Sequence, residues 1–327
     1  MTTPPQDHGS PERPAKAPPH VSVVIPVHDE APNLEELVER LVTTLDDADE
    51  TYELVFTDDG SRDDSLPCLL RLQESHAARM VIVELTRNFG QHMAVLAGLR
   101  EAQGEIIVTL DADLQNPPEE IPKLVRAIES GHDVVGGYRE TRHDSWLRTL
   151  ASRVANAFRR RLTSLHMRDH GCMLRAYRRD VVDRILSSQE TITFIPALAT
   201  LYASRPTEVR VAHSGRSRGH SKYGLYKLIR LNFDLITGFS AAPLQAFTVF
   251  GLLVSCSSLA MVVVLALRRL LVGPEVEGLF TLMGILFFLV GVAITGLGLV
   301  GEYVARIYQE VRCRPPYIVR TVHGPRA

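Results

Sequence analysis

Two carboxylates separated by one small residue, Asp111 and Asp113, follow a short apolar run and are followed in turn by Gln115. Carboxylate oxygens with this spacing can both point toward one hard cation. A Mg²⁺ or Mn²⁺ ion held in this way keeps open positions that bind a substrate diphosphate. The segment therefore indicates metal-assisted chemistry on a phosphorylated substrate. The alternative is an acidic turn at the end of a strand with no ligand.

A second acidic turn, Asp58-Asp59-Gly60-Ser61, follows another apolar run. A carboxylate at this position can accept a hydrogen bond from a ribose hydroxyl or a base N–H. Taken alone, Asp-Gly-Ser is also an ordinary turn sequence. Two acidic turns at the tips of nearby strands favour a binding site for a nucleotide.

Alternating strands and helices must position these turns. Short apolar runs predict strands, and apolar residues at helical spacing predict helices between them. The predicted strands are Val21–Val27, Tyr52–Thr57, Met80–Leu85, Ile106–Leu110 and Asp133–Gly136, and the predicted helices are Asn33–Leu45, His92–Ala102 and Glu119–Ser130. This order predicts an α/β fold with a mostly parallel sheet covered on both faces, in which ligands bind beyond the carboxyl ends of the strands. The basic stretch Arg139–Arg168 interrupts the alternation.

The overall composition excludes several classes of protein. The chain has 327 residues, a formal net charge of −2 and 45% hydrophobic residues. These values argue against a disordered chain and against a nucleic-acid-binding protein. The four cysteines form no Cys-x-x-Cys pair, so neither a disulfide framework nor a zinc site is expected.

The two ends of the chain differ sharply. Residues 1–20 contain six prolines and no apolar run, which predicts a disordered cytoplasmic tail rather than a secretion signal. Leu244–Leu267 and Gly278–Gly301 each contain 24 residues without a charge. Each exceeds the roughly 20 residues that cross a bilayer, so we expect a transmembrane hairpin rather than a pair of buried core helices.

Charged residues beside the hairpin predict its orientation. Arg268 and Arg269 lie in the connection, but basic residues outnumber them on the flanks, which are therefore expected to be cytoplasmic. The flanking residues are Lys222, Lys227, Arg230, Arg306, Arg312, Arg314 and Arg320. The predicted organisation is a soluble domain at 21–222, a juxtamembrane amphipathic helix at 223–243, the two spans, and a cytoplasmic tail at 302–327. Within that tail, Arg314–Val319 is expected to form an exposed strand that pairs between subunits.

Several motifs occur in an order that resembles a known family. They are Pro26-Val27-His28-Asp29-Glu30, Asp58-Asp59-Gly60-Ser61, Arg87-Asn88-Phe89-Gly90-Gln91, Asp111-Ala112-Asp113-Leu114-Gln115, Asp144-Ser145-Trp146, Gly171-Cys172-Met173-Leu174-Arg175 and Gly301-Glu302-Tyr303. This set resembles the family 2 glycosyltransferases of the polyprenyl-phosphate type, from about Val21 to about Val319. The resemblance implies a GT-A catalytic domain, Rossmann-like in its mostly parallel sheet, followed by a two-helix transmembrane hairpin.

The resemblance also implies which residues bind the donor, a UDP-sugar. Asp113 and Gln115 would bind Mg²⁺ or Mn²⁺, and Asp111 with Ala112 would support the nucleotide. The nucleoside pocket would be lined by Pro26, His28, Glu30 and Asp59. Arg216 and Lys222 match a loop that closes over the donor diphosphate, although a basic loop beside anionic lipid headgroups would look the same. His28-Asp29 departs from the family pattern, which more often has an aromatic residue and then Asn before Glu.

The acceptor implied by the resemblance is undecaprenyl phosphate or another polyprenyl phosphate. Arg139, Arg148 and Ser152 match the residues that bind its phosphate, on a basic amphipathic stretch that would also suit anchoring at the bilayer surface. Asp169 matches the proposed catalytic base. A phosphate monoester is already largely ionised at neutral pH, so Asp169 is expected to orient the acceptor or remove a residual proton. A structural pairing with Arg175 is the alternative.

The expected reaction is an inverting transfer at the inner (plasma) membrane by a multi-pass enzyme, and the resemblance implies a homo-oligomer, a tetramer. The motifs match most closely the members that transfer 4-deoxy-4-formamido-L-arabinose for lipid A or envelope modification. Glucose, mannose or N-acetylhexosamine is the alternative sugar, and a catalytically inactive membrane scaffold is the alternative of another class. A processive polysaccharide synthase is disfavoured because the only tryptophan, Trp146, does not stand in a Gln-x-x-Arg-Trp motif.

Overall fold

The computed structural model describes residues 18–77, 79–138, 172–188, 194–212, 242–273, 279–312 and 314–324. Its strands are β1 (Val21–Val27), β2 (Tyr52–Asp58), β3 (Met80–Leu85), β4 (Ile106–Thr109), β5 (Val134–Tyr138), β6 (Arg175–Arg178), β7 (Pro206–Arg210) and β8 (Val319–His323). Its helices are α1 (Ala31–Asp47), α2 (Ser65–His76), α3 (Gln91–Glu101), the 3₁₀ turn η1 (Pro118–Glu120), α4 (Ile121–Glu129), α6 (Arg179–Ser187), α7 (Ile195–Tyr202), α9 (Ala242–Val272) and α10 (Leu279–Val311).

The strands form one mixed sheet with the order β7-β5-β6-β4-β1-β2-β3-β8. Strands β4, β1, β2 and β3 are parallel, so their carboxyl ends lie along the same edge of the sheet. The chain moves from β1 to β2 on one side and returns to β4 on the other. This reversal is the topological feature at which open α/β sheets bind ligands. The α/β fold with a mostly parallel sheet is thus confirmed.

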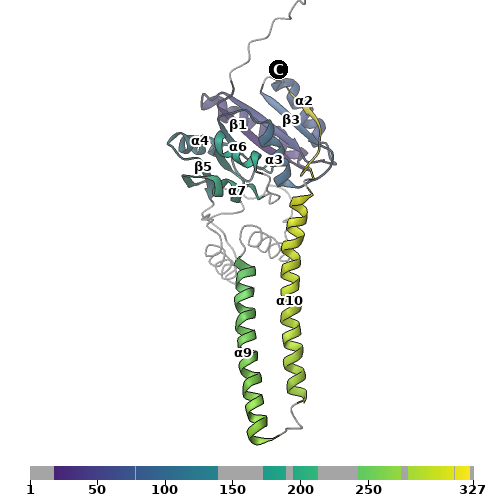
Figure 1. Cartoon of the computed structure of the whole chain (residues 1–327). Helices are drawn as coiled ribbons and strands as arrows, with labels where there is room; N and C mark the ends of the chain where they lie inside the picture. The colour runs from purple at the N-terminus through teal and green to yellow at the C-terminus, as the bar shows by residue number, and fades with distance from the viewer. Residues whose placement is uncertain are drawn as a thin grey trace, which may run out of the picture.

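Helices cover both faces of the sheet (Figure 1). Along β1, Val23 and Ile25 point into a core shared with α1, α2 and α4, whereas Val24 points into a core shared with α3, α6 and α7. This alternation follows from the two-residue period of a strand. The parallel strands are apolar on both faces because both are covered.

The first four strands and helices α1, α3 and α4 agree closely with the sequence prediction, whereas α2, between β2 and β3, was not predicted. Strands β1 and β3 have the predicted bounds, and α1 buries the five apolar residues at helical spacing, Leu34, Leu37, Val38, Leu41 and Leu45. The predicted helix at Glu119–Ser130 divides into η1 and α4, with prolines near the start of each. The basic stretch at 139–168 and the predicted amphipathic helix at 223–243 lie outside the described residues, apart from the first two residues of α9.

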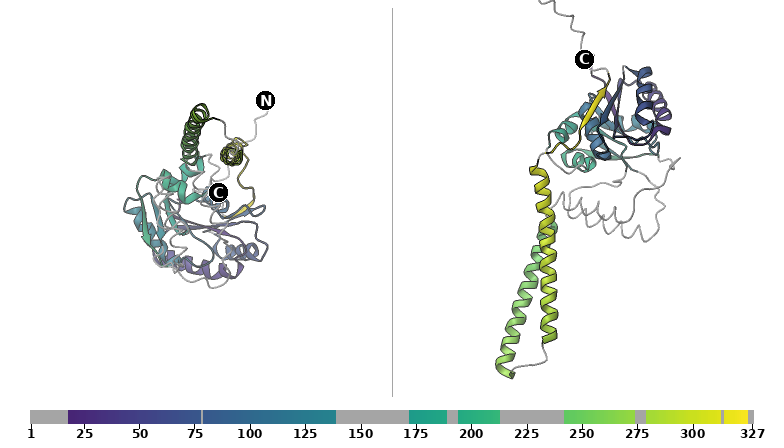
Figure 2. Two further views of the ribbon diagram at one scale, coloured as in Figure 1. Left: turned by 90° about the horizontal axis from the view of Figure 1, so that it is seen from below. Right: turned by 90° about the vertical axis from the view of Figure 1, so that its right-hand side faces the viewer.

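Two long apolar helices extend away from the sheet and lie side by side, α9 and α10 (Figures 1 and 2). Segments Leu244–Val264 and Ile285–Ala305 are each long and apolar enough to cross a membrane, with mean hydropathy values of 2.3 and 2.1. Their apolar side chains are mostly exposed rather than packed into the domain core. A core role for this pair is therefore excluded, and the helices are consistent with the predicted hairpin.

The C-terminal strand differs from its prediction. We expected a strand at Arg314–Val319 that pairs between subunits, but β8 begins at Val319 and pairs antiparallel with β3 of the same chain. The reason lies in the residue types. Pro315 and Pro316 cannot donate to a sheet ladder, whereas Val319, Thr321 and Val322 are β-branched. Pairing between subunits stays a prediction.

Candidate active site

Four loops follow the carboxyl ends of β1, β2, β3 and β4, and each contains one residue with a left-handed backbone. These residues are Asp29 (φ 57°), Gly60 (φ 63°), Gly90 (φ 98°) and Leu114 (φ 59°). A positive φ is uncommon for residues other than glycine, and it often marks functional loops. Left-handed turns therefore occur in all four loops at the edge where the sequence predicts the site.

Side chains of the β1 loop are bonded to the β2 loop. His28 donates from Nδ1 to the carbonyl oxygen of Asp59 at 3.0 Å. Asp29 accepts a hydrogen bond from the backbone N–H of Arg62 at 2.8 Å, and its own N–H donates to the hydroxyl of Ser61 at 3.1 Å. The unusual His28-Asp29 pair therefore has a local role, because both residues fix the β1 loop against the acidic turn.

Pro26 and Glu30 flank that pair. Pro26 lies within β1, opposite Thr57 of β2. Glu30 accepts a hydrogen bond from Nδ2 of Asn33 at 2.7 Å, and its N–H donates to Ser65 at 2.9 Å. These contacts shape the start of α1. The contact of Pro26 and Glu30 with a nucleotide stays a prediction.

The two carboxylates of the β2 loop are buried and accept backbone hydrogen bonds. Asp59 accepts from the N–H of Phe89 at 2.7 Å and of Gly90 at 2.8 Å. Asp58 accepts from the N–H of Ser61 at 3.3 Å. Burial raises the pKa of both carboxyl groups, and these hydrogen bonds oppose the rise.

Gly60 allows the β2 and β3 loops to meet. A Cβ at this position would lie 2.6 Å from the carbonyl carbon of Arg87 and 2.7 Å from the nitrogen of Asn88. Together with its positive φ, this close approach explains glycine at the third position of the Asp-Asp-Gly-Ser turn. The two loops thus form one packed unit.

A cavity of about 590 Å³ opens beside these loops. It is bordered by the ends of β1, β2 and β3 and by β8, and it contains both acidic and basic side chains. Its lining residues are His28, Asp29, Asp58, Gly60, Ser61, Arg62, Leu66, Glu84, Leu85, Thr86, Arg87, Asn88 and Arg320. Of the four residues predicted to line a nucleoside pocket, His28 borders this cavity. Asp59 instead holds the loop behind it.

The β4 turn has a different arrangement. Burial alternates along it, with Ala112, Leu114 and Asn116 buried and Asp111, Asp113 and Gln115 partly exposed. Three residues with side-chain oxygens therefore lie on the more accessible side of one turn. Such a donor set suits a hard divalent cation, so the residues present fit the Mg²⁺ or Mn²⁺ that the sequence implies.

The segment Arg87–Gln91 joins the two parts of the site. Its Phe89 and Gly90 N–H groups bind Asp59, and the side-chain amide of Gln91 donates to Asp111 at 2.5 Å. On the β4 turn, Asp113 accepts from the N–H of Gln115 at 3.1 Å. The Arg-Asn-Phe-Gly-Gln motif is therefore a bridge between the two acidic turns.

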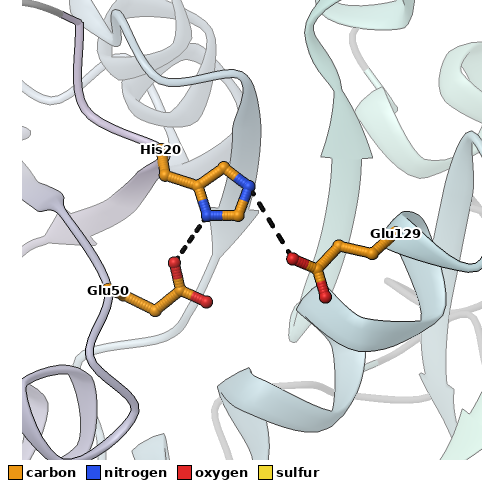
Figure 3. Close-up of side chains that lie close together, drawn as sticks. All are labelled: His20, Glu50 and Glu129. Carbon is orange, nitrogen blue, oxygen red and sulfur yellow. Dashed lines mark hydrogen bonds and ion pairs between the residues drawn. The ribbon is translucent and has the colours of Figure 1, made fainter.

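Another group of side chains resembles a metal site, but it lies elsewhere. His20, Glu50 and Glu129 approach one another near the amino end of β1 (Figure 3). His20 contacts Glu50 at 2.5 Å and Glu129 at 3.9 Å. Among the His, Cys, Asp and Glu side chains that the structure describes, this is the only group of three or more whose ligand atoms lie within 4.8 Å of one another. It is at the opposite edge of the sheet from Asp113, so it is not the predicted site.

Several predicted residues cannot be placed. The residues for the acceptor phosphate, the proposed base and the diphosphate loop all lie outside the described ranges: Arg139, Arg148, Ser152, Asp169, Arg216 and Lys222. Their roles stay predictions. In contrast, the structure adds Glu84 and Arg320 to the cavity wall. Glu84 could have been noticed in the sequence, because it is the only charged residue in the apolar run Met80–Leu85.

Comparison with known proteins agrees with this geometry. The family model described as Glycosyl transferase family 2 matches residues 22–186. The chain is 48% identical over 304 residues to an undecaprenyl-phosphate 4-deoxy-4-formamido-L-arabinose transferase of Edwardsiella ictaluri, covering 92% of this chain and 94% of the relative. It is 45% identical to the transferase of the same name from Aeromonas hydrophila subsp. hydrophila, covering 92% and 93%.

One solved structure with an overall likeness is glucosyl-3-phosphoglycerate synthase from Mycobacterium tuberculosis, in complex with Mn²⁺, UDP and glucosyl-3-phosphoglycerate. The sequences are 19% identical, the match covers 67% of this chain and 78% of the synthase, and the TM-score is 0.47.

Proposed function

Because the chain belongs to glycosyl transferase family 2, we propose that it transfers 4-deoxy-4-formamido-L-arabinose from a UDP-sugar to undecaprenyl phosphate. The observation that carries this proposal is the extent of the likeness to the curated transferases. The identity of 48% extends over 92% of the chain, well beyond the family model at residues 22–186. It therefore includes at least part of the apolar C-terminal region as well as the catalytic domain.

The cavity at the ends of β1, β2 and β3 supports a nucleotide donor. A nucleoside presents both hydrogen-bond donors and acceptors, and the cavity offers carboxylates at Asp58 and Glu84 and guanidinium groups at Arg87 and Arg320. The β4 turn lies on the other side of β1. We infer that the base and ribose occupy the cavity and that the diphosphate extends toward the β4 turn.

Asp113 and Gln115 would hold the divalent metal, with Asp111 beside the nucleotide. When bound, Mg²⁺ or Mn²⁺ supplies positive charge opposite the negative charge that develops on the departing diphosphate. The hydrogen bond from Gln91 to Asp111 and the bond from the Gln115 N–H to Asp113 keep these carboxylates in position. Such preorganised charge is often the largest contribution to catalysis.

The acceptor reaches the site from the membrane. Helix α10 ends at Val311, and Val319 already pairs with Leu85 at the carboxyl end of β3. Eight residues span at most about 28 Å, so the edge of the sheet that carries the site lies on the side of the hairpin, as Figure 1 also shows. A polyprenyl phosphate in a bilayer crossed by α9 and α10 would present its headgroup toward this edge.

The proposed reaction is a single inverting displacement. An oxygen of the lipid phosphate forms a bond to the anomeric carbon, while the bond from that carbon to the β-phosphate oxygen breaks and UDP leaves. Arg139, Arg148 and Ser152 would hold the acceptor phosphate, and Asp169 would orient it. Arg216 and Lys222 would neutralise the diphosphate. Positioning and charge neutralisation supply most of the rate in such a mechanism.

The product would be a sugar-phosphate lipid for envelope or lipid A modification, made on the cytoplasmic side by a homo-oligomer. The test uses full-length protein in detergent with undecaprenyl phosphate, Mn²⁺ or Mg²⁺ and a panel of UDP-sugars, followed by mass spectrometry of the lipid. We expect product from UDP-4-deoxy-4-formamido-L-arabinose and little from UDP-glucose or from the donor without the formyl group. Product only from a hexose donor would overturn the proposed sugar. Absence of product from every donor would favour the alternative that the chain is a catalytically inactive membrane scaffold.

A further inference from the structure

Strand β8, which follows the hairpin, places a basic side chain, Arg320, in the wall of the cavity beside β1, β2 and β3. The β3–β8 register runs from Ile82 opposite His323 to Glu84 opposite Thr321, and then shifts so that Leu85 lies opposite Val319. Arg320 is the extra residue, so it sits at a β-bulge. Bulges redirect side chains and are frequent beside active sites. Here the bulged residue borders the cavity.

Glu84 fixes the position of this guanidinium group. Arg320 contacts Glu84 at 2.6 Å and also donates to the carbonyl oxygen of Thr86 at 3.3 Å. The Glu84 side chain is only 10% exposed, whereas that of Arg320 is 58% exposed. The carboxylate is thus held inside the wall, and the guanidinium group remains accessible from the cavity.

The backbone around Arg320 is anchored on both sides. Before it, the carbonyl of Ile318 accepts a hydrogen bond from Thr86 at 3.0 Å, and Tyr317 packs against the core shared with α3. After it, Val322 packs against the same core, and His323 lies 3.6 Å from the second carboxylate oxygen of Glu84. The bulge is therefore part of the domain rather than a loose tail.

We propose that Arg320 is a donor-binding residue that contacts the base or ribose of the nucleotide. This inference rests on the proposed function, because it assumes that the cavity holds a nucleoside. Three strands separate β8 from β4 in the sheet, which at about 4.8 Å per strand spacing puts the two strands roughly 19 Å apart. Arg320 is thus at the end of the site away from the β4 turn, where base and ribose oxygens rather than the diphosphate would accept its N–H groups.

This assignment connects donor binding to the membrane anchor. The residue reaches the cavity only because the chain returns from α10 and pairs with β3. The hairpin and the donor cavity are therefore joined by one short segment, 312–318. A change that detaches β8 would weaken donor binding even though every residue of the two acidic turns remained in place.

The test measures binding of UDP, UMP and uridine to the full-length protein in detergent with Mn²⁺, by calorimetric titration. We expect Arg320→Ala to raise the Kd for UDP about tenfold, since a charge-assisted hydrogen bond is lost. The loss should be about as large for UMP and uridine. Arg320→Lys keeps the charge and should lose less. Thr321→Ala is the matched control, because Thr321 is an exposed residue of the same strand outside the cavity lining, and its Kd should match that of the wild type.

Different failures have different meanings. Wild-type protein that binds none of the three ligands would overturn the proposed donor itself. Normal wild-type binding with an unchanged Kd in Arg320→Ala would overturn only the role of Arg320. A loss seen with UDP but absent with uridine would also contradict the assignment, because Arg320 would then contact phosphate. If Arg320→Ala fails to fold, Arg320→Lys and Glu84→Gln give the same comparison, with a raised Kd for uridine expected in both.

Discussion

The two acidic turns of the site use the same residue type in opposite ways. On the β2 side, Asp58 and Asp59 are buried and accept hydrogen bonds from backbone N–H groups. On the β4 side, Asp111 and Asp113 are partly exposed and alternate with buried neighbours. Asp59 holds the β3 loop in place, and Asp58 borders the cavity from its wall. The β4 carboxylates are more accessible and are placed to bind a metal ion. Accessibility therefore separates the two turns, although their residue types are the same.

The largest effect that would test this contrast is expected at Asp113. Asp113→Ala should reduce transfer about 1,000-fold, equivalent to about 4 kcal/mol, because the metal would lose a charged ligand. The thermal unfolding midpoint should stay within about 2 °C, since surface changes cost little. Asp47→Ala, an exposed carboxylate at the end of α1, is the control. Full activity in Asp113→Ala would show that Asp113 is not needed to bind the metal.

Asp59 should behave in the opposite way. Asp59→Ala leaves the N–H groups of Phe89 and Gly90 without their acceptor, at a cost of about 3 kcal/mol in the free energy of unfolding. That cost lowers the thermal unfolding midpoint by about 6–12 °C for a domain of this size. Differential scanning fluorimetry in detergent measures it, with Asp47→Ala again as control. An unchanged midpoint with lost UDP binding would make Asp59 a ligand rather than a support.

His92, the residue after the bridging segment, makes the site region sensitive to acid. Its Nδ1 is buried without a hydrogen-bond partner in the described part of the chain, and burial lowers its pKa from 6.5 to about 4. The neutral form is thus favoured by the fold. Stability is fully present above pH 6.5 and falls as the pH drops toward 4, because the unfolded chain takes up the proton first.

At pH 5 this linkage amounts to about 1–2 kcal/mol. We expect the unfolding midpoint of the wild type to fall more between pH 7 and pH 5 than that of His92→Phe, which cannot titrate. The His92 ring lies edge-on to the ring of Phe194, with centroids 5.2 Å apart. Phenylalanine at position 92 therefore keeps an aromatic ring in this contact. Equal shifts in the two proteins would show that His92 does not contribute.

The smallest effect concerns the contact between α1 and the segment after the β4 turn. Arg40 binds Glu119 through two hydrogen bonds of 2.9 and 2.8 Å, and these bonds lower the pKa of Glu119. Because the pair is exposed, Arg40→Gln should cost less than about 1 kcal/mol and leave transfer nearly unchanged. Arg71→Gln, which breaks the more exposed pair with Glu35, is the control. A large loss of transfer would mean that α1 positions the metal side.

Much of the fold could be predicted because local patterns and packing agree. The apolar runs at Val21–Val27 and Met80–Leu85 became β1 and β3 with their predicted bounds. The position of β8 was missed because it depends on a free edge of β3, more than 230 residues away in the sequence. Only the folded sheet shows that edge.

The site was predicted less completely than the fold. The motifs identified both acidic turns, but their spacing could not show that Asp59 faces the backbone of the β3 loop. Nor could it show that the guanidinium of Arg320 lies beside Glu84. Such facts depend on where a side chain points, and that direction is set by the left-handed turns and the bulge.

The proposed division of the site places the nucleoside on the β1–β3 side and the metal and diphosphate on the β4 side. Its most direct test compares uridine and UDP binding to the wild-type protein with and without Mn²⁺ by calorimetry. We predict that uridine binds equally well in both conditions and that Mn²⁺ tightens UDP binding by at least about tenfold, or 1.4 kcal/mol. UDP binding that is the same with and without Mn²⁺ or Mg²⁺ would contradict it.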